Sequence, residues 1–158
     1  MNDNLTESIN MDLPHLENLF GFKLSCLASS VARIATEQYF NQLDLGLTDA
    51  RIVAIIGQEE PVSIKDISIK GRIDKGWISR SVTKLLNKGL LKKLQDKDDS
   101  RRVQLMLTDE GLRMHQHISQ LARKRNDDIL SVLTPGERAL VFEIMCKLQD
   151  HSDSILEK

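Results

Sequence analysis

The spacing of the apolar residues changes twice in the middle of this 158-residue chain, and the two changes confine a small β-structure between helices. Before Gly89, apolar residues recur every three or four positions, which is the spacing of an amphipathic helix. Residues 90–95 and 103–107 have the pattern of two short strands, and Thr108 begins a helical pattern again. The sequence therefore predicts a mainly α fold with one small pair of strands.

Two short helices are expected directly before these strands. Ser63 and Asp66 match the capping-box pattern at the start of the first helix, and Gly71 is expected in the left-handed position that ends it. Asp74 is expected to cap the second helix, and Gly89 to end it. Two short helices joined by a tight turn that contains glycine predict a helix-turn-helix. The two strands and the charged loop between them then predict a wing.

One segment in the middle of the chain is strongly basic, although the whole chain is slightly acidic. Between Pro61 and Leu105, twelve lysines and arginines stand against five aspartates, a net charge of +7. The whole chain carries −1, so the remaining residues carry −8. An ordinary solvated surface mixes both signs, whereas a concentrated basic segment is typical of a face that binds a polyanion. Beside a helix-turn-helix, this charge predicts binding to double-stranded DNA.

The outer face of the second short helix is expected to enter the major groove. Arg80 can pair with O6 and N7 of a guanine, and serine or threonine can reach base edges or phosphates. The start of the preceding helix, with Ser63 and Lys65, is expected to aim its backbone amides at a phosphate. The residues expected to contact DNA are Ser63, Lys65, Lys75, Gly76, Trp77, Ser79, Arg80, Thr83, Lys84, Arg101 and Arg102.

Trp77 is an unusual residue on such a helix face. Its indole either contacts DNA, on a sugar or a thymine methyl, or shields the core of the helix-turn-helix. Shielding of the core is the role that we expect.

The tip of the predicted wing carries Arg101 and Arg102 side by side. An arginine on a narrow loop can enter the minor groove, where the potential is most negative. Asp99, two residues before Arg101, is placed to hold that guanidinium through a bidentate pair. We therefore expect Asp99 to orient the wing and the arginines to contact DNA.

Longer helices flank the winged helix. The apolar spacing predicts one helix over residues 13–41 and another that Thr48 caps and Gly57 ends. Thr108 is expected to cap a long helix, and Thr134-Pro135-Gly136-Glu137 has the cap, proline and glutamate that begin a last one. The terminal helices carry more apolar positions than a small winged helix can cover, so we expect a second copy to bury them.

The expected organisation is a single domain over residues 1–158 with two functional parts. The winged-helix lobe is expected at 46–108, and dimerisation helices at 12–42 and 109–158. A symmetric homodimer would place two recognition helices about one DNA turn, roughly 34 Å, apart.

The chain lacks the patterns of common enzyme and metal sites. No phosphate-binding loop, dinucleotide fingerprint or Ser/His/Asp pattern is present, so we expect neither an enzyme nor a cofactor. Cys26 and Cys146 lie outside any CxxC pair, so no metal site is expected, and both thiols are expected to be buried. No apolar run approaches the ~20 residues of a membrane span, and the polar start lacks a secretory signal. The expected location is the cytoplasm, with no membrane partner.

Taken together, the chain resembles the MarR family of transcriptional regulators over most of its length. Four motifs carry the resemblance: Leu45-Gly46-Leu47-Thr48; Asp74-Lys75-Gly76-Trp77-Ile78-Ser79-Arg80; Leu85-Leu86-Asn87-Lys88-Gly89-Leu90-Leu91; and Asp99-Ser100-Arg101 followed by Leu107-Thr108-Asp109-Glu110-Gly111. Ser100 stands where the family usually has arginine, and Asn87 where it often has glutamate.

The resemblance implies a triangular α-helical dimer in which the first helix and the last two helices of each chain interlock. Its two winged helices would read a palindromic operator, and repression is the commoner outcome in the family. The resemblance also implies a pocket for a small organic effector, lined by the first, second and fifth helices. A ligand that favours one separation of the recognition helices would shift the DNA-competent population.

Three alternatives stay open at this point. A redox-sensing branch of the family has a reactive cysteine in the first helix, where Cys26 lies, although counting back from Leu45 puts that cysteine near Leu24. A metal-responsive branch would use a site between two chains, built from histidines and carboxylates. A winged helix can also bind an acidic protein partner in place of DNA.

Overall fold

The computed structural model describes residues 15–95 and 103–157. The chain divides into two compact units, residues 1–47 and residues 48–158. The predicted wing tip, with Asp99, Arg101 and Arg102, lies outside the described residues. Within the described ranges, no helix has both the length and the apolar content that a bilayer crossing requires.

The first unit consists of a short 3₁₀ turn, η1 (Leu16–Asn18), and the long helix α1 (Phe20–Leu43). The sequence predicted one helix over residues 13–41, and that expectation is wrong at both ends. Leu19 has an extended backbone and separates η1 from α1, because its amide closes the 3₁₀ turn on the Leu16 carbonyl. At the other end α1 continues to Leu43, and Asp44 ends it in the left-handed conformation, at φ 50°.

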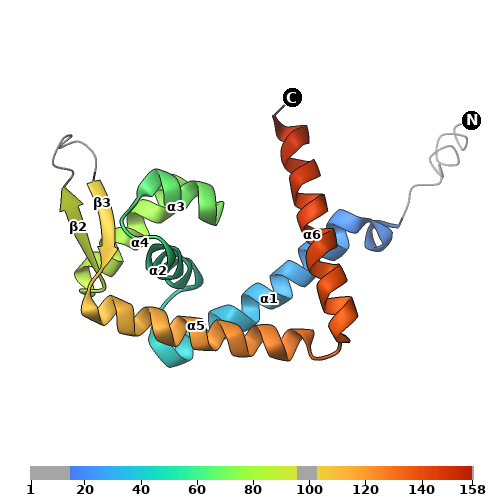
Figure 1. The fold of residues 1–158 in the computed structure, drawn as a ribbon, viewed down its shortest axis with the longest axis horizontal. Helices are drawn as coiled ribbons and strands as arrows, with labels where there is room; N and C mark the ends of the chain where they lie inside the picture. The colour runs from blue at the N-terminus through green and yellow to red at the C-terminus, as the bar shows by residue number, and fades with distance from the viewer. Residues whose placement is uncertain (1–14, 96–102, 158) are drawn as a thin grey trace, which may run out of the picture. The chain divides into compact units, whose positions relative to one another are not determined.

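The second unit has five helices among its described residues and a small three-stranded sheet, whose two longer strands lie side by side in Figure 1. The helices are α2 (Leu47–Gln58), α3 (Ile64–Gly71), α4 (Lys75–Asn87), α5 (Asp109–Leu130) and α6 (Pro135–Leu156). The strands are β1 (Val62–Ser63), β2 (Leu91–Gln95) and β3 (Val103–Leu107), in the order β1-β3-β2 with both pairs antiparallel. The predicted winged helix-turn-helix in a mainly α fold is confirmed.

The sheet closes one side of the winged-helix core. Leu91 pairs with Leu107 in the register of β2 and β3, and both side chains are buried together with Leu105. The two-residue strand β1, which the sequence did not predict, adds Val62 opposite Leu105. The fully buried side chains of the helices below are Ile52, Val53, Ile56, Ile67, Ile78, Leu85 and Ile118. The short helices are therefore stable because their apolar faces share this core with the sheet.

The predicted caps of the helices are confirmed with one exception. The Ser63 hydroxyl accepts from the Asp66 amide at 3.2 Å, and the Ser63 amide donates to the Asp66 carboxylate at 3.1 Å. These hydrogen bonds hold the pKa of the Asp66 carboxyl below its usual value. Asp74, Thr108 and the Thr134–Glu137 capping box likewise begin α4, α5 and α6. Thr48 is the exception, because α2 already begins at Leu47 and Thr48 lies inside it.

Two glycines were expected to end helices, and both expectations are wrong. Each of these glycines instead allows close packing against a neighbouring side chain. Gly57 lies within α2, where a Cβ would come 2.5 Å from Nδ1 of His115 on α5. Gly71 is the last residue of α3, and a Cβ there would meet Ile73 Cδ1 at 2.8 Å. The left-handed residue after α3 is Arg72, at φ 48°. Gly89, by contrast, ends α4 as predicted, with φ 70°.

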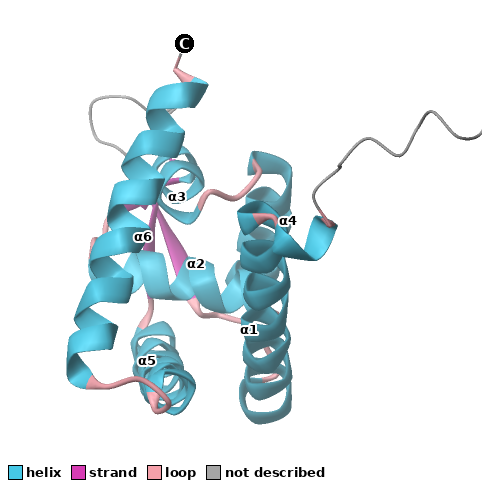
Figure 2. Cartoon of the chain, turned by 90° about the vertical axis from the view of Figure 1, so that its right-hand side faces the viewer, coloured by secondary structure: helices cyan, strands magenta, loops and turns pink. Residues whose placement is uncertain are grey.

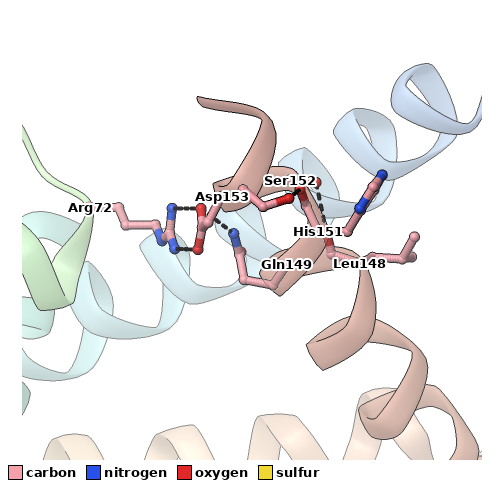
Figure 3. Close-up of polar contacts among 7 residues, drawn as sticks. Arg72, Leu148, Gln149, His151, Ser152 and Asp153 are labelled. Carbon is pink, nitrogen blue, oxygen red and sulfur yellow. Dashed lines mark hydrogen bonds and ion pairs between the residues drawn. The ribbon is translucent and has the colours of Figure 1, made fainter. Parts of the chain in front are cut away.

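The side chain of Arg72 connects the end of α3 to α6 (Figure 3). Its guanidinium makes two parallel hydrogen bonds to Asp153, at 3.0 and 2.6 Å, and Gln149 donates to the same carboxylate at 3.1 Å. The arginine lowers the pKa of Asp153, and the carboxylate raises that of Arg72. This bidentate pair joins residues 81 positions apart.

Most of helix α6 is exposed in the single chain. The turn between Ser131 and Thr134 directs α6 away from α5, which Figure 2 shows nearly end-on. No residue of α6 is buried. Its large exposed apolar side chains are Leu140, Phe142, Ile144, Met145, Leu148, Ile155 and Leu156.

The junction between the wing and α5 depends on the absence of a side chain at Gly111. The Thr108 amide donates to the Leu90 carbonyl at 3.1 Å, and the Thr108 hydroxyl donates to the Gly89 carbonyl at 2.6 Å. These bonds bring the first turn of α5 so close to the end of α4 that a Cβ on Gly111 would lie 2.1 Å from the Leu90 oxygen.

We therefore expect Gly111→Ala to lower the free energy of unfolding by about 1–3 kcal/mol, because backbone must move to admit the methyl group. Gly136→Ala is the matched control, since Gly136 also lies in the first turn of a helix and a Cβ there would meet no neighbour within 4 Å. That variant should be neutral or more stable by up to ~1 kcal/mol. Urea unfolding followed by circular dichroism measures both, and equal stabilities would contradict the close approach.

Candidate nucleic-acid interface

Helix α4 has one face in the core and one face in solvent. Ile78, Ser81, Val82 and Leu85 are buried. The Asp74 carboxylate accepts from the Gly76 amide at 2.8 Å and so fixes where the helix begins. The residues on the opposite, exposed face are Lys75, Gly76, Trp77, Ser79, Arg80, Thr83, Lys84 and Asn87. All seven α4 residues predicted to contact DNA thus lie on the solvent side of one helix.

The two hydroxyls on this face are hydrogen-bonded along the helix. Ser79 Oγ donates to the Lys75 carbonyl at 2.9 Å, and Thr83 Oγ1 donates to the Ser79 carbonyl at 3.0 Å. Each hydroxyl proton is then directed at the backbone, and the oxygen lone pairs are left to accept hydrogen bonds from a ligand. The exposed face of α4 therefore offers hydrogen-bond acceptors between its positively charged side chains.

Trp77 does not shield the core, so that expectation is wrong. The residue is 58% exposed, and the Arg80 guanidinium lies over its indole, 4.3 Å from the ring centroid. The next residue, Ile78, points into the core instead and is completely buried. The spacing of three residues puts Trp77 and Arg80 on the same side of α4, because residues three apart are neighbours on a helix surface.

Lys84 is bound to a carboxylate that the sequence did not identify. Its Nζ lies 2.7 Å from Oδ2 of Asp49 in the first turn of α2. The Asp49 side chain is only 7% exposed, whereas that of Lys84 is 50% exposed. The pair joins α2 to α4 across a sequence separation of 35 residues, and a local sequence pattern cannot predict a contact between residues so far apart.

The start of α3 is already occupied by its own capping box. The Ser63 hydroxyl lies 2.7 Å from Oδ2 of Asp66, and this carboxylate stands at the helix end expected to face a phosphate. Lys65 is exposed beside it. Two further side chains bind the backbone at the ends of α3 and β3. Arg51 donates to the Gly71 carbonyl at 2.9 Å, and Glu60 accepts from the Leu107 amide at 2.8 Å.

The structure also bears on the two cysteines, on a metal site and on a pocket for an effector. Cys26 on α1 and Cys146 on α6 are both exposed, so the expectation of two buried thiols is wrong. Within the described parts of the chain, no three histidine, cysteine or acidic side chains gather closely enough to hold a metal ion. An open hollow of about 740 Å³ lies along α5 and is lined by polar residues from His115 to Asp128. Nδ1 of His115 is buried and has no hydrogen-bond partner among the described residues.

The comparisons with known proteins point to one family. The family model for the MarR family matches residues 45–103, from the turn before α2 to the start of β3. The HTH-type transcriptional regulator BilQ of Clostridioides difficile is 30% identical over 103 residues, which are 65% of this chain and 70% of BilQ. SarZ of Staphylococcus haemolyticus, also an HTH-type transcriptional regulator, is 25% identical over 72% of this chain and 77% of its own length.

Solved structures of the family share the fold. A MarR/EmrR family regulator from Acinetobacter sp. ADP1 superposes with a TM-score of 0.82 at 23% identity, covering 89% of this chain and 99% of that one. PcaV of Streptomyces coelicolor, in complex with its natural ligand, gives 0.75 at 23% identity, with 90% and 99% coverage. The Staphylococcus aureus MepR–DNA complex gives 0.76 at 15% identity, with 84% and 98% coverage.

The Lys84–Asp49 pair makes a prediction about stability. Lys84→Ala should lower the free energy of unfolding by about 1–2 kcal/mol, because it removes the cation from a nearly buried carboxylate. The loss is smaller than for a fully buried ion pair because the lysine side chain is half exposed and water screens its charge.

Asp49→Asn is the matched variant for this pair. In a double-mutant cycle by urea unfolding, Lys84→Ala should cost clearly less in the Asp49→Asn background than in the wild type. Additive effects would show that the two side chains do not stabilise each other.

Proposed function

The chain belongs to the MarR family of transcriptional regulators, and on that premise we propose that it binds a palindromic operator as a homodimer and represses transcription. The observation that carries this proposal is the exposed face of α4, where cations and hydroxyls are presented on a helix narrow enough for the major groove. A dimer bound across a promoter would exclude polymerase, which is why we propose repression.

In this proposal α4 reads base edges while the elements on either side contact the backbone. Arg80 would pair with a guanine, and Ser79 and Thr83 would accept from exocyclic amino groups. Lys65 and Lys75 would contact phosphates at the two helix starts. At the wing tip, one of the two arginines, Arg101 or Arg102, would enter the minor groove, and Asp99 would hold the guanidinium of Arg101.

The dimerisation part of the proposal rests on the terminal helices. We propose that residues 12–42 and 109–158 form the dimer interface and that residues 46–108 form the DNA-binding lobe. Helix α6 has no buried residue, and α1 also exposes large apolar side chains, among them Phe20 and Leu27. Monomeric proteins rarely leave contiguous apolar surface of this kind uncovered.

We further propose a small organic effector that releases the operator. Support comes from the open hollow along α5, whose polar lining residues run from His115 to Asp128 and can hydrogen-bond a small ligand. A ligand that bound there more tightly in one conformation of the dimer would shift the population toward that conformation. Selection of bound duplexes from a random pool, followed by a screen of metabolites that release them, tests the effector directly.

The DNA-binding proposal predicts two separable effects of arginine removal. Arg101→Ala should weaken binding to all duplexes and make log Kd less dependent on salt, by about one phosphate contact. Arg80→Ala should instead relax sequence preference, because a bidentate base contact contributes roughly 1–3 kcal/mol of discrimination. Fluorescence anisotropy at several salt concentrations measures both.

Two results would count against this assignment. Equally weak binding of palindromic and scrambled duplexes would remove the sequence-specific regulator and favour a winged helix that binds an acidic protein. The reverse pattern for the two arginine variants would mean that the wing and the recognition helix have exchanged roles.

The homodimer predicts that a charge on α6 separates the subunits. Met145→Glu should weaken dimerisation by roughly tenfold or more, because a carboxylate would be buried in the interface. Ile69→Glu on α3 is the matched control, since Ile69 is 64% exposed but lies outside the proposed interface. Sedimentation equilibrium distinguishes them, and equal dimer constants for both variants and the wild type would contradict the interface.

A further inference from the structure

Trp77 exposes more than half of its surface and lies in the most basic segment of the chain. Tryptophan and arginine are the side chains that contact surfaces most often use as anchors. The fold does not need its bulk, because Ile78 and Leu85 fill the core beneath α4. The function of Trp77 is therefore to be sought on the outer side of the helix.

The Trp77 indole restricts the orientation of Arg80, the side chain proposed to pair with a guanine. The Arg80 guanidinium lies over the indole face at 4.3 Å, within the range of a cation–π interaction. Stacking occupies the flat face of the guanidinium, while its N–H donors lie in the plane at the edge. A stacked arginine can therefore keep the indole and still offer a fork to O6 and N7 of a guanine.

The stack also determines what lies next to that guanine. A guanidinium that pairs with a base edge lies near the plane of the base, so the indole beside it would be level with the neighbouring base pair. In the major groove the apolar group of that base pair is the C5-methyl of thymine. The ring would contact this methyl, whereas it would leave a cytosine edge or an amino group without a hydrogen-bond partner.

We propose that Trp77 is a positioning residue that holds Arg80 edge-on to a guanine, and that the pair selects a guanine adjacent to a thymine in each half-site. The proposal rests on the function proposed above, in which α4 enters the major groove. It assigns the pair a specific dinucleotide and gives the exposed tryptophan a role.

The test uses the full-length protein and the duplex selected from a random pool. Each guanine of a half-site is replaced in turn by 7-deazaguanine, which lacks the N7 acceptor, and each thymine by deoxyuracil, which lacks the methyl group. Wild-type protein should lose affinity at one guanine and at the thymine next to it. Arg80→Lys should lose the guanine effect, because a lysine keeps the charge but has no fork.

The tryptophan variants separate positioning from bulk. Trp77→Leu keeps an apolar side chain without a π face, and we expect its discrimination between guanine and 7-deazaguanine to fall by about twofold to fivefold. Trp77→Phe should recover most of that discrimination. Thermal unfolding of both variants should match the wild type, so the change in base preference cannot come from loss of fold.

The two proposals fail in different ways. If the wild type selects no duplex, the proposed function is overturned and this inference with it. If the wild type binds a selected duplex but Trp77→Leu discriminates the guanine as well as the wild type does, only the positioning role is overturned. A selected site whose critical guanine has no neighbouring thymine would overturn the dinucleotide preference.

Discussion

The contact between the end of α4 and the start of α5 determines the geometry of the winged-helix unit. The Leu90 carbonyl accepts from Thr108, and Gly111 leaves the space that lets the two backbones approach. Because β2 follows α4 and β3 leads into α5, this one junction orients α4, the two strands and α5 together. The Leu91–Leu107 pair buried beside it continues the same contact into the core.

The sequence predicted the parts of the fold that depend on neighbours along the chain. The capping boxes at Ser63 and Thr134 and the cap at Asp74 are complete within four residues, and all of them occur. Gly57 and Gly71 were misinterpreted because their reason is packing against distant side chains, which the local pattern does not contain. Strand β1 was missed since two residues are too few to show an alternating pattern.

The candidate interface was predictable as a list of residues but not as a set of contacts. The exposed face of α4 follows from the helical period, and the seven predicted residues on it lie together. The partners of Trp77 and Lys84 could not be predicted from the sequence, because a side chain on a helix surface can contact any of several neighbours in space. The choice for Lys84 depends on how α2 crosses α4, and that crossing is a property of the core.

The contact between Lys84 and Asp49 also bears on how such a protein would search a genome. Sequence-independent attraction to DNA grows with each phosphate that a cation neutralises, and a chromosome offers millions of competing sites. A lysine whose charge is balanced by an internal carboxylate adds little to that attraction. On the proposed function, the chain would therefore bind irrelevant DNA less strongly than its count of basic residues suggests. Base contacts would then supply a larger share of the energy that holds it at its target.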